Sequence, residues 1–108
     1  MAYTARSNGP DPMRPSILLD QHREAIRQIV TAHRARNPRV FGSVLYGEDT
    51  DDSDLDLLVD PEDGMTLFDV GAIRWKLRDL LGIEVDVVSP RALPTRFRDG
   101  VLAAAKPV

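Results

Sequence analysis

Two short stretches between positions 40 and 60 contain residues whose types and spacing could do chemistry. Gly42-Ser43 ends a short apolar run, and after ten further residues Asp54 and Asp56 stand at alternate positions of a second apolar run. Every second side chain of a strand points to the same face, so we expect these two carboxylates to lie together. A third acid, Asp86, stands in a later apolar run with the same alternation.

The three aspartates allow a chemical interpretation and a simpler one. Two like charges about 5 Å apart repel by roughly 3 kcal/mol at an effective dielectric near 20. A divalent cation removes that repulsion, and Mg²⁺ prefers oxygen ligands. If the two acidic strands are neighbours, about 4.8 Å apart, Asp54, Asp56 and Asp86 would meet around one or two metal ions. The alternative is a solvated strand edge whose charges have no function.

Gly42-Ser43 has the features of a phosphate-binding turn. Glycine permits close approach of the backbone to a ligand, and Ser43 can begin a helical turn whose free amides point toward an anion. Taken alone, the pair favours an ordinary turn. Together with the acids it predicts a phosphate site facing a metal-binding cluster, which suits transfer of a nucleoside monophosphate from a nucleoside triphosphate.

Two other ligand-binding loops fit the sequence poorly. An EF-hand beginning at Asp52 would require glycine where Leu57 stands and glutamate where Asp63 stands. The Gly-Lys-Ser/Thr signature of a Walker phosphate loop does not occur in the sequence. We therefore expect neither a calcium loop nor a Walker loop.

Length and composition narrow the class of protein. A chain of 108 residues suits one domain, and the lack of cysteine excludes disulfides and thiolate zinc sites. The net charge of −3 argues against a broad basic surface that wraps nucleic acid. No apolar run approaches the roughly 20 residues that cross a bilayer, and the N-terminus lacks the apolar core of a signal peptide. We expect a cytoplasmic protein with no membrane partner.

The apolar pattern predicts how the candidate residues are positioned. We expect a flexible tail over residues 1–15 and one folded domain over residues 16–108. The predicted elements are a helix over 16–36 with Ser16 as N-cap, strands over 39–41, 54–59 and 83–88, helices over 66–81 and 94–105, and a tail over 106–108. Asn37-Pro38 should end the first helix, and Gly82 should close the second.

This order predicts an α/β (α+β) domain with two layers. Helices would cover one face of a small mixed sheet, and the aspartates would stand on the open face. Trp75 falls outside the apolar stripe of its helix. It could cover the edge of the core, or it could contact a partner, since tryptophan is enriched at the energetic centres of interfaces.

The motifs resemble those of the nucleotidyltransferase superfamily of DNA polymerase beta. The chain is similar, more narrowly, to the antitoxin-type minimal nucleotidyltransferases, or MNT proteins, of prokaryotes. The resemblance covers about residues 18–108 and includes the stretch 86–93. It implies that Gly42 and Ser43 bind the triphosphate of the nucleotide. It also implies that Asp54 and Asp56 are direct metal ligands, and that Asp86 binds one metal and helps activate the acceptor hydroxyl.

The resemblance also implies a reaction and a partner. Some proteins of this kind transfer AMP from ATP to a tyrosine of a HEPN-domain toxin, so the resemblance implies ATP, two Mg²⁺ ions and a hetero-oligomer with such a toxin for this chain. One alternative is an antitoxin that neutralises a HEPN ribonuclease by binding alone, with a vestigial nucleotide site. Another is half of a split antibiotic- or RNA-modifying enzyme, although the chain lacks a large second domain. Tyr46 departs from the family pattern, because it stands where many members have arginine.

Overall fold

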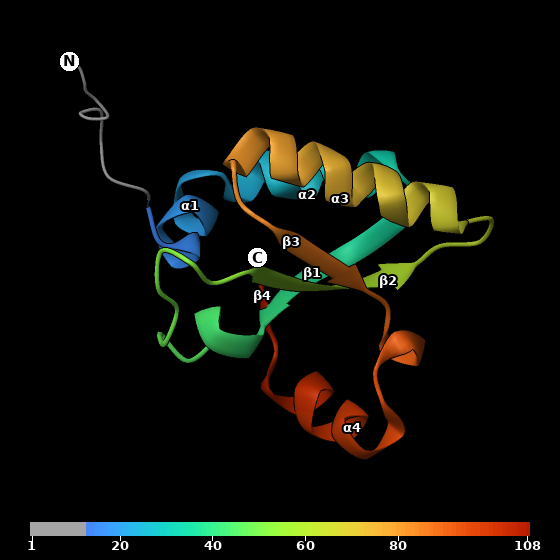
Figure 1. Cartoon of the computed structure of the whole chain (residues 1–108). Helices are drawn as coiled ribbons and strands as arrows, with labels where there is room; N and C mark the ends of the chain where they lie inside the picture. The colour runs from blue at the N-terminus through green and yellow to red at the C-terminus, as the bar shows by residue number, and fades with distance from the viewer. Residues whose placement is uncertain (1–12) are drawn as a thin grey trace.

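A computed structural model describes residues 13–108 of the chain (Figure 1). Ten elements follow one another along the described residues. They are α1 (Pro15–Gln21), α2 (Arg23–Ala32), β1 (Ala35–Phe41), the 3₁₀ turn η1 (Gly42–Val44), β2 (Leu55–Pro61), α3 (Leu67–Leu81), β3 (Val85–Val88), the 3₁₀ turn η2 (Pro90–Ala92), α4 (Thr95–Ala104) and β4 (Lys106–Pro107).

The four strands form one mixed sheet in the order β3-β2-β1-β4. Strand β2 runs parallel to β3, whereas β1 is antiparallel to β2 and to β4. Helices α2 and α3 pack side by side on one face of the sheet (Figure 1). The core between the layers is built from aliphatic side chains, among them Ile26, Val30, Leu55, Leu57, Val59, Ile73, Leu77, Val85 and Val87. The predicted two-layer mixed α/β fold is confirmed.

The second face of the sheet is less open than predicted. Strand alternation places Leu58 on the same face as Asp56, yet Leu58 is fully buried. The turn η2 contacts β2, and α4 lies on this side of the sheet (Figure 1). On this face β2 is therefore covered at Leu58, whereas Asp56 and Asp60 on either side of it stay partly accessible.

The first helix differs from the prediction for residues 16–36. The structure has two helices that are separated at His22, and the second ends at Ala32. Strand β1 begins at Ala35, directly after the left-handed backbone of Arg34. The Asn37-Pro38 pair lies inside β1, where left-handed Asn37 coincides with a shift in the pairing register. The proline signal therefore marked an irregular strand and not the end of a helix.

The structure also differs from the prediction at the C-terminal residues and at the start of β3. The expected tail over 106–108 is wrong, because Lys106 pairs with Val40 in β4, and buried Val108 accepts a hydrogen bond from Arg27 at 2.8 Å. Strand β3 begins at Val85, two residues later than predicted. The tail predicted over residues 1–15 lies mostly outside the described residues, whose first helix already includes Pro15.

Helix α3 matches its prediction closely. Thr66 is the N-cap and forms a reciprocal capping box with Asp69. Gly82 closes the helix in the left-handed conformation, and its N–H donates to the carbonyl of Arg78 at 2.8 Å. The apolar stripe is only partly buried, however, because Leu67 at its start is 87 % exposed. Within residues 13–108, no helix is long and apolar enough to span a membrane.

Asp49 connects the loop after η1 to the start of α1. Its side chain is fully buried and accepts hydrogen bonds from the Ser16 backbone N–H at 2.9 Å and from Arg14 at 3.2 Å. The prediction of Ser16 as the N-cap is therefore wrong, because α1 begins at Pro15 and the Ser16 N–H is itself capped by Asp49. Burial raises the pKa of Asp49, but the hydrogen bonds from Ser16 and Arg14 outweigh burial and lower it overall.

We expect Asp49→Ala to lower the free energy of unfolding at pH 7 by about 1–3 kcal/mol, because it leaves a buried amide and a guanidinium without their acceptor. The lowered pKa means that this stability is present above the ordinary value of 3.8 and is lost as pH falls through the folded-state pKa. Urea unfolding at pH 7 and pH 3 measures both effects. Asp52→Ala in the same loop is the control, because Asp52 is exposed and should change stability by less than about 0.5 kcal/mol. Equal losses for the two variants would contradict the capping role of Asp49.

Candidate active site

The turn at Gly42 lies directly against a carboxylate of the neighbouring strand. Gly42 follows the last residue of β1 and has a positive φ of 76°, a conformation that L side chains rarely adopt. A Cβ atom at this position would stand 2.2 Å from Oδ2 of Asp56. Only glycine therefore allows the backbone of this turn and the Asp56 carboxylate to be so close. Ser43, the next residue, is partly buried in η1.

The register of the parallel strands brings two of the predicted acids together. Asp56 on β2 and Asp86 on β3 are direct partners, and Asp54 immediately precedes Leu55, the first residue of β2. The pKa of Asp56 is raised from 3.8 to about 6. Partial burial is the largest cause, followed by the negative charges of Asp86 and Asp54 and by a hydrogen bond with Asp86. A cation placed among the three carboxylates would offset the repulsion between their negative charges.

The donor set at this position suits a hard divalent cation. Crowded carboxylate oxygens are the ligands that Mg²⁺ prefers, and the Gly42 backbone forms one wall of the space in front of Asp56. Within residues 13–108, however, no three His, Asp or Glu side chains are arranged so that they could already hold a metal ion. Asp54 is exposed at the start of β2. Its role as a metal ligand, and the metal roles of Asp56 and Asp86, stay predictions.

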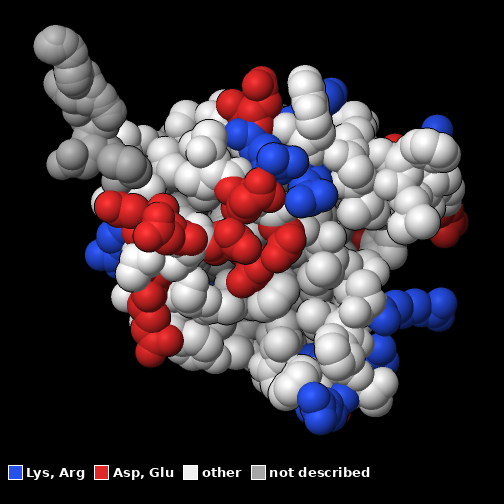
Figure 2. All heavy atoms as spheres, viewed as in Figure 1, with Lys and Arg blue, Asp and Glu red and all other residues white. Residues whose placement is uncertain are grey.

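Sequence reasoning missed a further group beside the acids. Glu84 stands two residues before Asp86, and its backbone carbonyl accepts a hydrogen bond from Leu55 N–H at 3.0 Å. Its carboxylate pairs with Arg74 at 3.3 Å and with Arg78 at 2.9 Å, both from α3. Figure 2 shows acidic side chains gathered on this face with basic side chains directly beside them. The alternation Glu84-Val85-Asp86 was the available signal, but Glu84 precedes β3 and its carboxylate pairs with α3.

A small cavity adjoins the other side of the Gly42 turn. Its volume is about 220 Å³, and it lies between the turn and α4. Tyr46, which is 65 % exposed, contributes to its lining together with Phe41 and Val101. The position at which the family resemblance leads us to expect arginine is therefore occupied by an accessible aromatic side chain next to the predicted phosphate-binding turn.

Comparison with known proteins identifies the family. The sequence profile described as "Nucleotidyltransferase domain" matches residues 19–105, which include all five predicted site residues. The chain belongs to the nucleotidyltransferase domain family. This nucleotidyltransferase is 37 % identical over 87 residues to the protein adenylyltransferase MntA of Thermococcus cleftensis, with 73 % of this chain and 88 % of that protein covered. It is 29 % identical to a candidate protein adenylyltransferase of Methanocaldococcus jannaschii, with 81 % and 94 % covered.

Solved structures agree with this assignment. A candidate minimal nucleotidyltransferase superposes on this nucleotidyltransferase with a TM-score of 0.81 and 44 % identity, over 92 % of this chain and 100 % of that one. A toxin-antitoxin complex with AMP-PNP matches with a TM-score of 0.64 and 20 % identity, over 86 % and 71 % of the two chains. At that identity the second match demonstrates a shared fold.

Proposed function

We propose that this nucleotidyltransferase transfers AMP from ATP to a hydroxyl group of a partner protein, in a reaction that requires two Mg²⁺ ions. The observation that carries the proposal is the paired carboxylates of Asp56 and Asp86 beside the Gly42 turn. The sequence similarity to a protein named as a protein adenylyltransferase supports the choice of AMP and of a protein acceptor.

In this proposal the site residues on the different strands have different roles. Gly42 and Ser43 on one flank bind the triphosphate, and Asp56 and Asp86 hold the metals together with the accessible Asp54. Mg²⁺ held by these residues would neutralise negative charge on the phosphates. Asp86 is exposed and belongs to the edge strand β3, so it can accept the proton of the acceptor hydroxyl. The hydroxyl oxygen bonds to the α-phosphorus, the bond from that phosphorus to the bridging oxygen breaks, and pyrophosphate leaves.

The acceptor we propose is a tyrosine of a HEPN-domain toxin, so that the reaction makes this chain an antitoxin. The relative from Thermococcus cleftensis carries the name MntA, and a chain of a solved MntA–HepT toxin-antitoxin complex shares the fold of this chain. These likenesses support a toxin as the partner class.

The test is label-free. We expect the purified chain, incubated with ATP, Mg²⁺ and the proposed HEPN-domain toxin, to add the mass of one or more AMP groups to a tyrosine of that protein. Peptide mass spectrometry locates the modification, and a growth assay records the loss of toxicity. A partner that is bound but stays unmodified with each of the four nucleoside triphosphates would overturn the proposed reaction.

One observation favours a second candidate function, neutralisation of the toxin by binding alone. Tyr46 stands where the family pattern has arginine, which removes a cation from the neighbourhood of the phosphates. Under this alternative, the double variant Asp54→Ala with Asp56→Ala still protects cells from the toxin. Loss of protection by a folded double variant that still binds the toxin would exclude neutralisation by binding.

A further inference from the structure

Three residues form a row across one face of the sheet. Phe41 on β1 is the direct partner of Asp56 on β2, and Asp56 is in turn the direct partner of Asp86 on β3. Paired residues of neighbouring strands project their side chains from the same face of a sheet, with Cβ atoms roughly 5 Å apart. The ring of Phe41 therefore stands beside the acids, on the flank away from β3.

The cavity of about 220 Å³ beside the Gly42 turn begins at this aromatic ring. It is lined by Phe41, by Gly42 and Tyr46 from the turn and its continuation, and by α4 at Gly100. Helix α4 lies on the side of the sheet opposite α2 and α3 (Figure 1). The cavity is therefore on the face that carries the acids. The Gly42 backbone contacts it on one side and the Asp56 carboxylate on the other.

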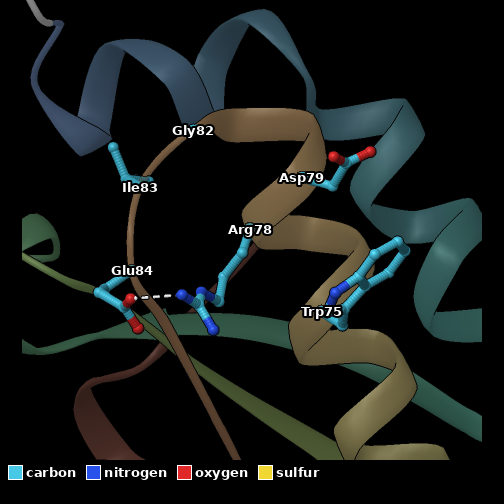
Figure 3. Close-up of a pocket in the computed structure, with 6 residues that line it drawn as sticks. All are labelled: Trp75, Arg78, Asp79, Gly82, Ile83 and Glu84. Atoms are coloured by element: carbon cyan, nitrogen blue, oxygen red, sulfur yellow. Dashed lines mark ion pairs between the residues drawn. The ribbon is translucent and has the colours of Figure 1, made fainter.

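A larger cavity, of about 520 Å³, shares no residue with the Gly42 turn. Its lining comes from the end of α3 and the loop after it, as Figure 3 shows: Trp75, Arg78, Asp79, Gly82, Ile83 and Glu84. Trp75 is 64 % exposed there, so the interpretation from the sequence that placed it over the core edge is wrong. Arg78 is already paired with Glu84 at 2.9 Å. A ligand bound at the Gly42 turn would therefore extend into the smaller cavity and not into this one.

The lining of the smaller cavity suits a flat aromatic group. Among the described residues that line it, no side chain is charged, and the Tyr46 hydroxyl is the only polar side-chain group. A phosphate or carboxylate would meet no cationic side chain there. The volume is below the roughly 300–1,000 Å³ of pockets that hold a whole drug-sized ligand, so it suits one part of a nucleotide. Nucleobases stack on aromatic side chains, because every base has a π-face.

Backbone hydrogen bonds fix the position of Tyr46. The N–H of Leu45 donates to the carbonyl of Gly42 at 3.1 Å, and the N–H of Gly47 donates to the carbonyl of Val44 at 3.2 Å. Tyr46 lies between these two donors, so its ring is held at the cavity by the turn that is proposed to bind the phosphates. Its side chain is 65 % exposed, which leaves a large aromatic surface that a ligand can cover.

Gly100 is a second feature of the cavity, and packing within the protein does not explain it. Glycine inside a helix is less stable than alanine, because it loses more backbone freedom on folding. Nothing lies within 4 Å of the Cβ that alanine would add at this position of α4. The helix could therefore carry a side chain here without a clash. Its absence keeps the α4 wall of the cavity open.

We propose that the cavity between the Gly42 turn and α4 binds the base of the nucleotide, and that the base stacks on the ring of Tyr46. The base is joined through the ribose to the α-phosphate, which the proposed reaction requires beside Asp56, and Phe41 connects that position to the cavity. Tyr46 thus contributes base binding where the family pattern has a positive charge. This inference rests on the proposed function, because it needs a nucleoside triphosphate at the Gly42 turn.

The test compares ATP with inorganic tripolyphosphate, which has the phosphates but no base. Isothermal titration calorimetry in Mg²⁺ gives both affinities without an acceptor protein. Tyr46→Ala should raise Kd for ATP about tenfold or more and leave Kd for tripolyphosphate within about twofold of the wild type. Tyr46→Phe keeps the ring and should restore most of the ATP affinity. Phe97→Ala is the matched control, because it removes an exposed aromatic ring of α4 that does not line the cavity.

Gly100→Leu tests the opposite wall of the cavity without changing Tyr46. The new side chain should occupy part of the space and raise Kd for ATP about tenfold, again with little effect on tripolyphosphate. Because leucine favours a helix more than glycine does, the Tm of this variant should not fall below that of the wild type. Circular dichroism verifies that every variant is folded. A loss of ATP affinity in a protein of undiminished stability distinguishes a blocked site from a damaged fold.

Three results would overturn the base site. The first is an ATP affinity that is unchanged in both Tyr46→Ala and Gly100→Leu. The second is an equal loss of affinity for ATP and tripolyphosphate in Tyr46→Ala, which would place Tyr46 at the phosphates. The third is a raised KM for the acceptor protein with unchanged ATP affinity, which would place the acceptor in the cavity. ATP binding that depends on Tyr46, without any transfer by the wild-type chain, would support the base site and defeat the proposed function.

Discussion

Asp56→Asn is expected to stop nucleotide transfer and, in the absence of metal, to make the protein more stable above pH 6. The loss of transfer should be roughly a hundredfold or more, because the variant removes a proposed metal ligand. The metal would no longer be held where it stabilises the negative charge that develops on the phosphate. The gain in stability follows from the raised pKa of Asp56, about 6 against an ordinary 3.8. Burial and the charges of Asp86 and Asp54 make the ionised form of this carboxyl unfavourable in the folded state.

The sign of the pH dependence is opposite to that of Asp49. Between pH 3.8 and about 6 the folded state holds the Asp56 proton more firmly than the unfolded state does, so stability falls as pH rises through this window. The pKa difference corresponds to about 3 kcal/mol, and solvent screening of this part-exposed group reduces it to about 1–2 kcal/mol. Asparagine is neutral at every pH and removes this penalty.

Urea unfolding in EDTA at pH 4 and pH 8 measures the effect. Asp56→Asn should be more stable than the wild type by about 1–2 kcal/mol at pH 8 and nearly equal to it at pH 4. Addition of Mg²⁺ at pH 8 should stabilise the wild type more than the variant. Asp60→Asn on the same strand is a control of equal chemistry, and it should lose stability because it breaks the ion pair with Arg39. Identical stability of Asp56→Asn and the wild type at pH 8 would contradict the crowding of the acids.

Gly42→Ala should also abolish most of the transfer, for a steric reason. The added Cβ would lie 2.2 Å from Oδ2 of Asp56, so the carboxylate must move out of its position in the site. The left-handed φ of 76° adds backbone strain of about 1–2 kcal/mol. We expect a total loss in the free energy of unfolding of about 2–4 kcal/mol, and transfer reduced by about a hundredfold.

Gly47→Ala is the control that isolates the steric clash. Gly47 has a φ of 69°, close to that of Gly42, but nothing lies within 4 Å of the Cβ that alanine would add. Both variants therefore have similar backbone strain, and only Gly42→Ala disturbs Asp56. Thermal unfolding and transfer from radiolabelled ATP compare the two proteins. Equal losses of transfer in both would show that backbone strain, and not contact with Asp56, is responsible.

The elements that carry the site were largely predictable from the sequence. Alternation in two apolar runs placed Asp56 and Asp86 on one face of adjacent strands, and the register pairs these two residues directly. The same periodicity, together with Gly82, defined α3 almost to its ends. These features depend on local patterns that repeat over several residues, which is why sequence reasoning can recognise them.

Other features depend on contacts between distant segments and left little local signal. The C-terminal strand β4 forms because the edge of β1 accepts it, whereas residues 106–108 alone resemble a tail. The cap of α1 comes from Asp49, more than thirty residues away along the chain. Leu58 is buried on the expected open face because η2 and α4 return beneath the sheet. None of these arrangements can be inferred from the periodicity of one segment.

The most direct test of the proposed AMP transfer is to follow the α-phosphate and the γ-phosphate of ATP separately. The wild-type chain, Mg²⁺ and the proposed HEPN-domain partner are incubated in parallel with ATP labelled at the α-phosphorus and with ATP labelled at the γ-phosphorus. A site that joins the acceptor oxygen to the α-phosphorus predicts label in the protein from α-labelled ATP alone, with γ-label released as pyrophosphate. Label in the protein from the γ-phosphorus, or from neither position, would contradict it.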